Sequence, residues 1–166
     1  MVPRVFGYPP PVSAPDRRVI ADAGPTAAQP PFRFSMRQRV HLHDTDAIGV
    51  VYFGNWARFV EQSVVAYRQH LGLDPIGTPG HWYLIRAYAI DFHASARLGD
   101  EIETFVRCAT IGRTSQTFEA RIERTGDHLA DARLVVVGVD AHGAGATPTP
   151  VPDETRRVIT GFDRAA

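Results

Sequence analysis

One stretch of apolar residues at helical spacing, followed by several segments in which apolar and polar residues alternate, sets the main constraint on the fold. Over residues 55–71 the apolar positions recur three or four apart, which places them on one face of a helix of about four to five turns. Gly72 follows at the expected C-terminal stop. Before the helix, residues 34–43 alternate as a strand, with Arg39, His41 and His43 on one side.

Four further strands are expected after the helix, at residues 82–94, 101–111, 115–124 and 129–140. The connections between them, near Leu98, Gly112 and Gly126, are short, contain glycine and suit hairpins. One helix and a five-stranded antiparallel sheet can bury one face of each against the other. The sequence therefore predicts an α+β fold with a long helix packed on a five-stranded antiparallel sheet.

The proline distribution divides the chain into three parts. Eight of the 13 prolines fall within residues 1–31, which predicts an extended and disordered N-terminal arm. Residues 32–140 form the expected folded domain. Residues 141–166 are expected to be a loop-like tail with one short helix near 153–159.

Composition excludes several classes of protein. Eighteen basic residues, all of them arginine, balance 18 acidic ones, so we expect neither nucleic acid nor a membrane surface as a partner. The one cysteine, Cys108, cannot form an internal disulfide or a Cys-rich zinc site. The chain has no apolar run near the roughly 20 residues of a membrane span and no signal-peptide pattern, so we expect a cytoplasmic protein.

Two carboxylates, Asp44 and Asp46, precede the predicted helix across a glycine-containing turn. N–H groups in the first turn of a helix lack internal partners and carry the positive end of its dipole, so they can hold an oxyanion. A carboxylate beside them could attack a carbonyl carbon or activate water. The alternative is that both aspartates only cap the turn.

The run H-D-T-D-A-I-G-V-V-Y-F-G-N-W at residues 43–56 resembles the signature of the 4-hydroxybenzoyl-CoA thioesterase family. Members of that family have the hotdog fold and cleave acyl-CoA thioesters. The later runs G-D-E-I-E-T and G-R-T-S-Q-T-F are also similar to the family, so the likeness covers about residues 34–140. The first 31 residues have no counterpart in it.

The resemblance implies roles for particular residues. Asp46 matches the catalytic carboxylate, as nucleophile or general base, and the backbone N–H of Phe53 falls at the carbonyl-polarising position. Glu61 is a lower-ranked second carboxylate, because some hotdog thioesterases use an acid within the helix; the alternative is a surface glutamate. Substrate contacts are expected from the signature residues Gly49, Val50, Val51, Tyr52 and Trp56.

The resemblance also bears on the substrate. Many members that act on short acyl chains have His where this chain has Phe53, which favours an aromatic or polyketide-like acyl group over a small aliphatic one. Coenzyme A carries phosphates, and the turn containing Arg113, Thr114 and Ser115 offers a guanidinium, hydroxyls and N–H groups to bind them.

No cofactor and no metal are expected, since coenzyme A is part of the substrate and His41 and His43 lack a third ligand at recognisable spacing. By analogy with the family we expect a homodimer or homotetramer. Two alternatives stay open beside acyl-CoA hydrolysis: release of an acyl group from an acyl carrier protein, and a non-catalytic hotdog module that binds acyl-CoA. A hotdog dehydratase fits less well, because its usual histidine and acid motif is absent.

Overall fold

The computed structural model describes residues 32–78, 80–140 and 146–164. The predicted arm at residues 1–31 lies outside the described residues, as do the first five residues of the predicted tail. Within the described part, no helix is long and apolar enough to span a lipid bilayer.

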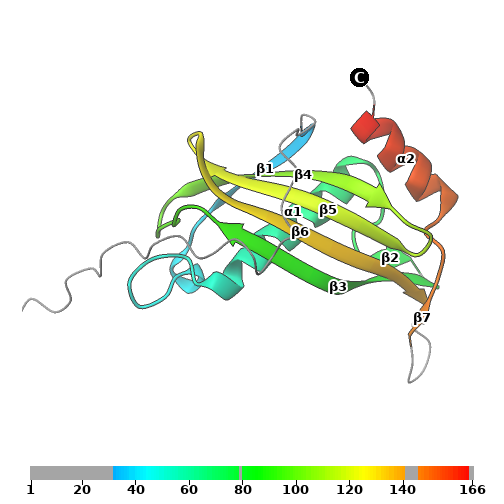
Figure 1. Ribbon diagram of the computed structural model, residues 1–166, viewed down its shortest axis with the longest axis horizontal. Helices are drawn as coiled ribbons and strands as arrows, with labels where there is room; N and C mark the ends of the chain where they lie inside the picture. The colour runs from blue at the N-terminus through cyan, green and yellow to red at the C-terminus, as the bar shows by residue number, and fades with distance from the viewer. Residues whose placement is uncertain (1–31, 79, 141–145, 165–166) are drawn as a thin grey trace, which may run out of the picture.

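A curled antiparallel sheet forms the body of the protein (Figure 1). Its five long strands are β1 (Phe34–Arg39), β3 (His81–Phe92), β4 (Glu101–Ile111), β5 (Ser115–Arg124) and β6 (Asp127–Asp140). Two further strands of two residues each, β2 (Gly77–Thr78) and β7 (Thr147–Pro148), pair with β3 and β6. The predicted count of five therefore holds for the long strands and is wrong for the sheet as a whole, because strands of two residues are too short to leave an alternating pattern.

The strand order is β1-β4-β5-β6-β3-β2, with β7 beside β6. Strands β4, β5 and β6 follow one another as hairpins, as expected. The hairpin expected near Leu98 is wrong, because β3 pairs with β6 rather than with β4. Residues 93–100 instead cross the end of the sheet, where Val51 N–H donates to the Ala96 carbonyl (2.9 Å) and Val40 N–H donates to that of Asp100 (2.9 Å).

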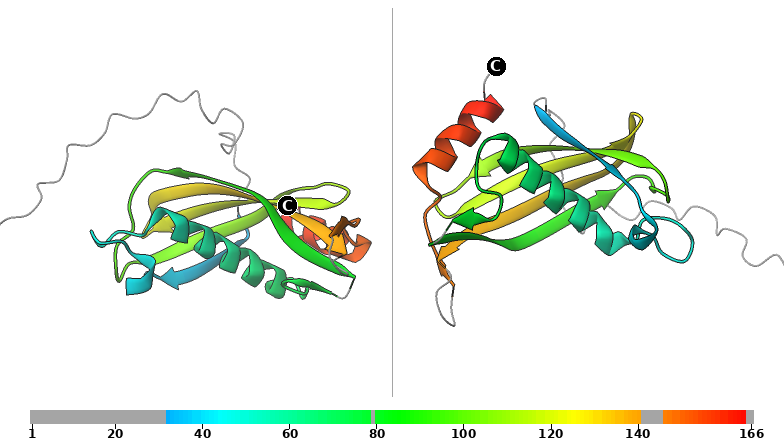
Figure 2. Two further views of the ribbon diagram at one scale, coloured as in Figure 1. Left: turned by 90° about the horizontal axis from the view of Figure 1, so that it is seen from below. Right: turned by 180° about the vertical axis from the view of Figure 1, so that it is seen from behind.

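The predicted helix is α1 (Trp56–His70), which lies across one face of the sheet (Figure 2). Its buried side chains recur at helical spacing and include Phe59, Val60, Val64 and Tyr67, all 5% exposed or less. They pack against inward-facing residues of the central strands, such as Ile102, Val106, Phe118 and Ile122. Gly72 follows the helix with a φ of +70°, a conformation that glycine adopts without strain.

The C-terminal helix is longer than the sequence predicts and packs against the sheet. It is α2 (Asp153–Arg164), and it stands beside the part of β4 that extends past β1 (Figure 1). Ile159 is 1% exposed, and Asp163 Oδ2 accepts hydrogen bonds from the Tyr67 hydroxyl (2.7 Å) and the Cys108 N–H (2.9 Å). Burial, with the Asp163 hydrogen bond and charge, raises the pKa of Tyr67. Burial first, and then the Asp163 charge, raise the pKa of Cys108 to about 12.

Candidate active site

The segment between β1 and α1 is fixed by one buried carboxylate, Asp44. Its Oδ2 accepts the His41 N–H (2.8 Å), and its Oδ1 pairs with the Arg58 guanidinium of α1. Its carbonyl accepts hydrogen bonds from Tyr52 N–H (2.9 Å) and Asn55 Nδ2 (3.0 Å). These bonds connect both ends of the loop to the start of the helix, and Asp44 itself is 0% exposed.

This anchoring explains where the first strand ends. Because the Asp44 carboxylate takes the His41 N–H, residues Leu42–Asp44 turn into a short 3₁₀ helix, η1. The strand predicted to reach residue 43 therefore stops at Arg39. His41 and His43, which were predicted to share one side of that strand, lie outside it; both are exposed, and their rings stack with centroids 5.5 Å apart.

Asp46, two residues further on, is exposed to solvent. Its Oδ1 accepts the Ile48 N–H (2.9 Å), and its carbonyl accepts the Gly49 N–H (3.0 Å). No described residue donates a hydrogen bond to the other carboxylate oxygen, Oδ2. The two aspartates of the motif thus differ in environment: Asp44 is buried and fully bonded, whereas Asp46 presents a free oxygen at the surface.

The turn from Gly49 to Tyr52 aligns the chain for entry into the helix. Gly49 has a φ of +75°, which side chains rarely allow. Val50 then bridges to Arg97 in antiparallel fashion, and Val51 bridges back to Thr45. These contacts hold the loop against the segment that follows β3.

The helix entrance is a short 3₁₀ helix, η2 (Phe53–Asn55), that leads directly into α1. Phe53 is its first residue, where an N–H has no partner within the helix. Phe53 is 67% exposed and Tyr52 45%, with ring centroids 4.5 Å apart, while Trp56 is buried.

A hollow of about 260 Å³ opens beside this entrance. It is lined by Val51, Phe53, Trp56, Phe92, His93, Ala94 and Ser95. The predicted residues Val51, Phe53 and Trp56 therefore share one wall. Within a single chain neither Asp46 nor Glu61 lines this hollow.

Glu61 is exposed on α1 and lies elsewhere. It borders two other depressions, one of about 90 Å³ with Arg68 and Tyr83, and one of about 400 Å³ with Met36 and Gln62. The structure thus places it one to two helical turns beyond the entrance, away from the aromatic hollow.

The predicted phosphate-binding turn, with Arg113, Thr114 and Ser115, lies at the opposite end of the sheet (Figure 1). Strand β4 begins beside the aspartate loop and runs for 11 residues to this turn, which makes it about 35 Å long. The turn is held by Val151 N–H, which donates to the Arg113 carbonyl (2.8 Å), and by Gly138 N–H, which donates to that of Thr114 (2.8 Å). One chain therefore does not bring Asp46 and Arg113 together.

Sequence reasoning missed the far wall of the hollow, which Phe92 to Ser95 supply at the end of β3. It also missed Arg58, the partner of Asp44. The only local signal was the position of Arg58 itself, a charged residue in the first turn of the predicted helix, and charged residues on a helix more often face solvent. The wall could not be inferred, because it depends on β3 crossing the sheet end next to the aspartate loop.

Comparison with known proteins identifies the family of this chain. The Thioesterase-like superfamily matches residues 40–159. The acyl-CoA thioester hydrolase YbgC of Escherichia coli is 30% identical over 105 residues, which are 61% of this chain and 78% of that protein. The 1,4-dihydroxy-2-naphthoyl-CoA hydrolase of Synechocystis is 28% identical over 127 residues, which are 74% of this chain and 92% of that one.

Solved structures share the fold. A thioesterase from Thermus thermophilus, complexed with coenzyme A and zinc, superposes with a TM-score of 0.68 at 23% identity and covers 80% of this chain and 95% of its own. The resemblance that residues 43–56 suggested is thereby confirmed. The chain belongs to the thioesterase-like superfamily, as an acyl-CoA thioesterase with the hotdog fold.

Proposed function

We propose that this thioesterase hydrolyses an acyl-CoA with Asp46 as nucleophile or general base and the Phe53 N–H as oxyanion donor. The observation that carries this proposal is the contrast between the two aspartates. Both carboxylate oxygens of Asp44 are bonded to residues that hold the loop in place. Asp46 has one carboxylate oxygen without a hydrogen bond to a described residue, exposed at the surface of the loop that leads into the helix entrance.

The chemistry requires two groups. The N–H at the helix entrance polarises the thioester carbonyl and holds the oxyanion that forms when its carbon is attacked. The Asp46 carboxylate either attacks that carbon itself or removes a proton from the attacking water. In both routes water is consumed, the C–S bond breaks, and the carboxylic acid and the thiol of coenzyme A are released. No cofactor is needed, because coenzyme A is part of the substrate.

An aromatic or polyketide-like acyl group suits the hollow at the helix entrance. Its wall carries the rings of Phe53, Trp56 and Phe92, with Trp56 and Phe92 at 5.7 Å in an edge arrangement. Tyr52 packs beside Phe53. Flat rings offer favourable edge and offset contacts to an aromatic acyl group.

A site built from two chains would unite the groups that one chain separates. Strand β3 pairs with β6 along one edge. On its other edge, within the described residues, His81 and Trp82 pair with β2 and Tyr83 N–H donates to the Ile76 carbonyl (3.2 Å), and no strand pairs with β3 beyond these residues. Leu84 and Ile85 on this strand are 49% and 52% exposed. Such an edge is a template for a second chain. We therefore propose a homodimer through β3, or a homotetramer of such dimers, with Asp46 from one chain and Arg113 from a neighbour.

Light scattering tests the assembly. The variant Ile85→Arg places a charge on the proposed dimer edge and should give an inactive monomer. The matched variant Arg157→Glu changes an exposed charge on α2 and should stay oligomeric. An Ile85→Arg monomer with full activity would refute the two-chain site.

Hydrolysis of matched acyl-CoAs tests the substrate class. Acetyl-CoA, a long aliphatic acyl-CoA and an aromatic acyl-CoA are compared by release of free thiol, and the aromatic substrate should have the highest kcat/KM. The variant Phe53→Ala keeps the backbone N–H and loses the ring, so the ratio of aromatic to acetyl turnover should fall at least about tenfold. An unchanged ratio would contradict an aromatic acyl site at Phe53.

The same panel distinguishes the alternatives. If the acyl group is carried by a carrier protein in the cell, the acyl-carrier-protein ester of the best acyl group is cleaved faster than its coenzyme A ester. A non-catalytic binding module would bind acyl-CoA in calorimetry and release no thiol from any ester.

A further inference from the structure

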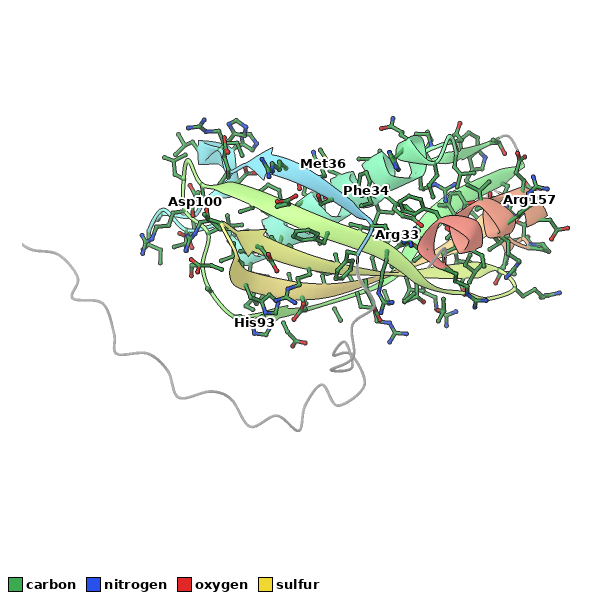
Figure 3. The ribbon with its side chains drawn as sticks, turned by 90° about the horizontal axis from the view of Figure 1, so that it is seen from above. Arg33, Phe34, Met36, His93, Asp100 and Arg157 are labelled. Atoms are coloured by element: carbon green, nitrogen blue, oxygen red, sulfur yellow. The ribbon has the colours of Figure 1, made fainter. Side chains whose placement is uncertain are left out.

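Two histidines and one aspartate converge at the end of the sheet near the aromatic hollow. His93 directly follows β3, and His128 and Asp131 lie on β6. The pairing of β3 with β6 places Asp91 opposite Asp131, which brings His93 alongside. Figure 3 shows His93 on the side of the sheet away from β1.

The donor atoms of this cluster lie close together. The distance from His93 Nε2 to Asp131 Oδ2 is 3.0 Å, and that from His128 Nε2 to the same oxygen is 2.9 Å. The two imidazole rings lie with centroids 4.3 Å apart. All three ligand atoms are within 4.8 Å of one another.

Hydrogen bonds within the cluster do not satisfy its buried atoms. Asp131 is 8% exposed, and its Oδ1 has no hydrogen-bond partner among the described residues. His128 Nε2 is also buried and makes no hydrogen bond to a described residue, although Asp131 Oδ2 lies 2.9 Å from it. Buried polar atoms in folded proteins nearly always have partners, so two atoms without a hydrogen bond in one cluster leave room for a bound ion or water. A ring nitrogen and a carboxylate oxygen can both be satisfied by a cation.

The charges around the cluster favour a cation. Asp91 stands directly opposite Asp131, and like charges in that position destabilise a sheet. Glu123 of β5 stands opposite His128. Arg121, opposite Asp131, is the basic group at these register positions, and its Nε lies 2.8 Å from Glu123 Oε1. These register positions therefore hold three carboxylates and one guanidinium, and the next basic residue on this face of β6 is Arg133, two residues beyond Asp131.

We propose that His93, His128 and Asp131 bind one divalent transition-metal ion, of which Zn²⁺ is the best match. Imidazole nitrogens and a carboxylate oxygen are zinc ligands at about 2.0–2.2 Å, and three protein ligands leave a position for water. A tetrahedral ion of this size separates its ligand atoms by about 3.4 Å. The observed separations of 2.9 and 3.0 Å need to widen by only a few tenths of an ångström.

The ion would link the sheet to the hollow. His93 is both a ligand of the proposed site and part of the hollow's wall, next to Phe92 and Ser95. A metal bond from His93 to β6 would fix the end of β3 and with it this wall. The ion would position this wall, and its binding does not depend on Asp46 chemistry.

The sequence expectation of no metal considered the pair His41 and His43. The rings of these two histidines stack with their centroids 5.5 Å apart, and among the described residues they are not part of a three-ligand group. The cluster proposed here was not visible in the sequence, because His93 is 35 residues from His128 and only strand pairing brings the two together.

Zinc titration of the full chain tests the proposal. The protein is produced without a polyhistidine tag, stripped with chelator and titrated with Zn²⁺ by calorimetry, and Co²⁺ absorption reports the coordination. We expect one ion per chain. His128→Ala and Asp131→Asn should each weaken binding more than about 100-fold, beyond the 10–100-fold effect of losing an outer partner.

Two further variants make the test specific. His70→Ala removes an exposed histidine that contacts the rings of Phe34 and Phe162 outside the cluster, and it should bind the ion as the wild type does. His93→Ala removes a ligand whose side chain is 43% exposed, so it should fold even if the more buried substitutions do not. The proposal is overturned if the wild type binds no ion, or if His93→Ala binds it as tightly as His70→Ala does.

Discussion

Replacing Asp44 by asparagine should destabilise the fold, whereas the same replacement at Asp46 should not. Asp44 is fully buried and accepts a backbone N–H from His41 while it pairs with the Arg58 guanidinium. An asparagine of the same size has one acceptor oxygen and one donor nitrogen. It can satisfy His41 or Arg58 but must turn an N–H toward the other.

The magnitude follows from these contacts. Breaking a buried ion pair by removing one partner costs about 3–5 kcal/mol. The Arg58 side chain is 35% exposed and can turn toward water, which favours the lower end, about 3 kcal/mol. For a chain of 166 residues each kcal/mol lowers Tm by about 2–4 °C, so Tm should fall by about 6–12 °C. Asp46 is exposed and its turn bond survives in asparagine, so the expected change is within about 0.5 kcal/mol.

Thermal unfolding followed by circular dichroism measures both variants under the same conditions. A guanidinium-chloride titration gives the free energies of unfolding and checks that the slope is unchanged. The reasoning is refuted if Asp44→Asn is as stable as the wild type, or if Asp46→Asn loses as much stability as Asp44→Asn does.

Three other outcomes follow from the structure. Tyr67→Phe removes the hydroxyl that donates to Asp163, and it should lower the free energy of unfolding in denaturant by about 1.5–3 kcal/mol. Tyr88→Phe removes a buried hydroxyl with no hydrogen-bond partner among the described residues, so it should be neutral or stabilising. Equal losses in the two variants would contradict this. Burial raises the pKa of Cys108 to about 12, so at pH 8 iodoacetamide should alkylate the folded protein about a thousandfold more slowly than a free thiol, measured by mass spectrometry; fast labelling of the native state would argue against it. Arg113→Ala should raise KM for the best acyl-CoA several-fold and leave kcat nearly unchanged, and an unchanged KM would remove Arg113 from the coenzyme A site.

The elements with strong periodicity could be predicted from the sequence. Strands β4 and β5 have the predicted bounds, and α1 differs by one residue at each end, because each buries one face and its apolar pattern reflects that. The end of β1 could not be predicted, since it depends on a tertiary contact: the Asp44 carboxylate that accepts the His41 N–H is paired with Arg58 of α1.

The sequence motif indicates the local part of the candidate site, the turn and the start of the helix, but not the residues that surround it. The run around Asp46 and Phe53 indicates the helix entrance, because turn and helix start are local in sequence. The far wall at Phe92 and His93, and the distance between Asp46 and Arg113, follow from strand order. Strand order is a long-range property, and the alternation of side chains along β3 does not indicate that this strand pairs with β6.

The catalytic role of Asp46 is tested most directly by thiol release from the best acyl-CoA by the wild type and by Asp46→Asn at equal concentration. We expect the variant to keep the wild-type Tm and to lose at least about a thousandfold in kcat, because asparagine cannot ionise, attack the carbonyl or accept a proton from water. A folded Asp46→Asn protein that hydrolyses the ester at the wild-type rate would show that Asp46 only holds the turn, and would contradict the proposed mechanism.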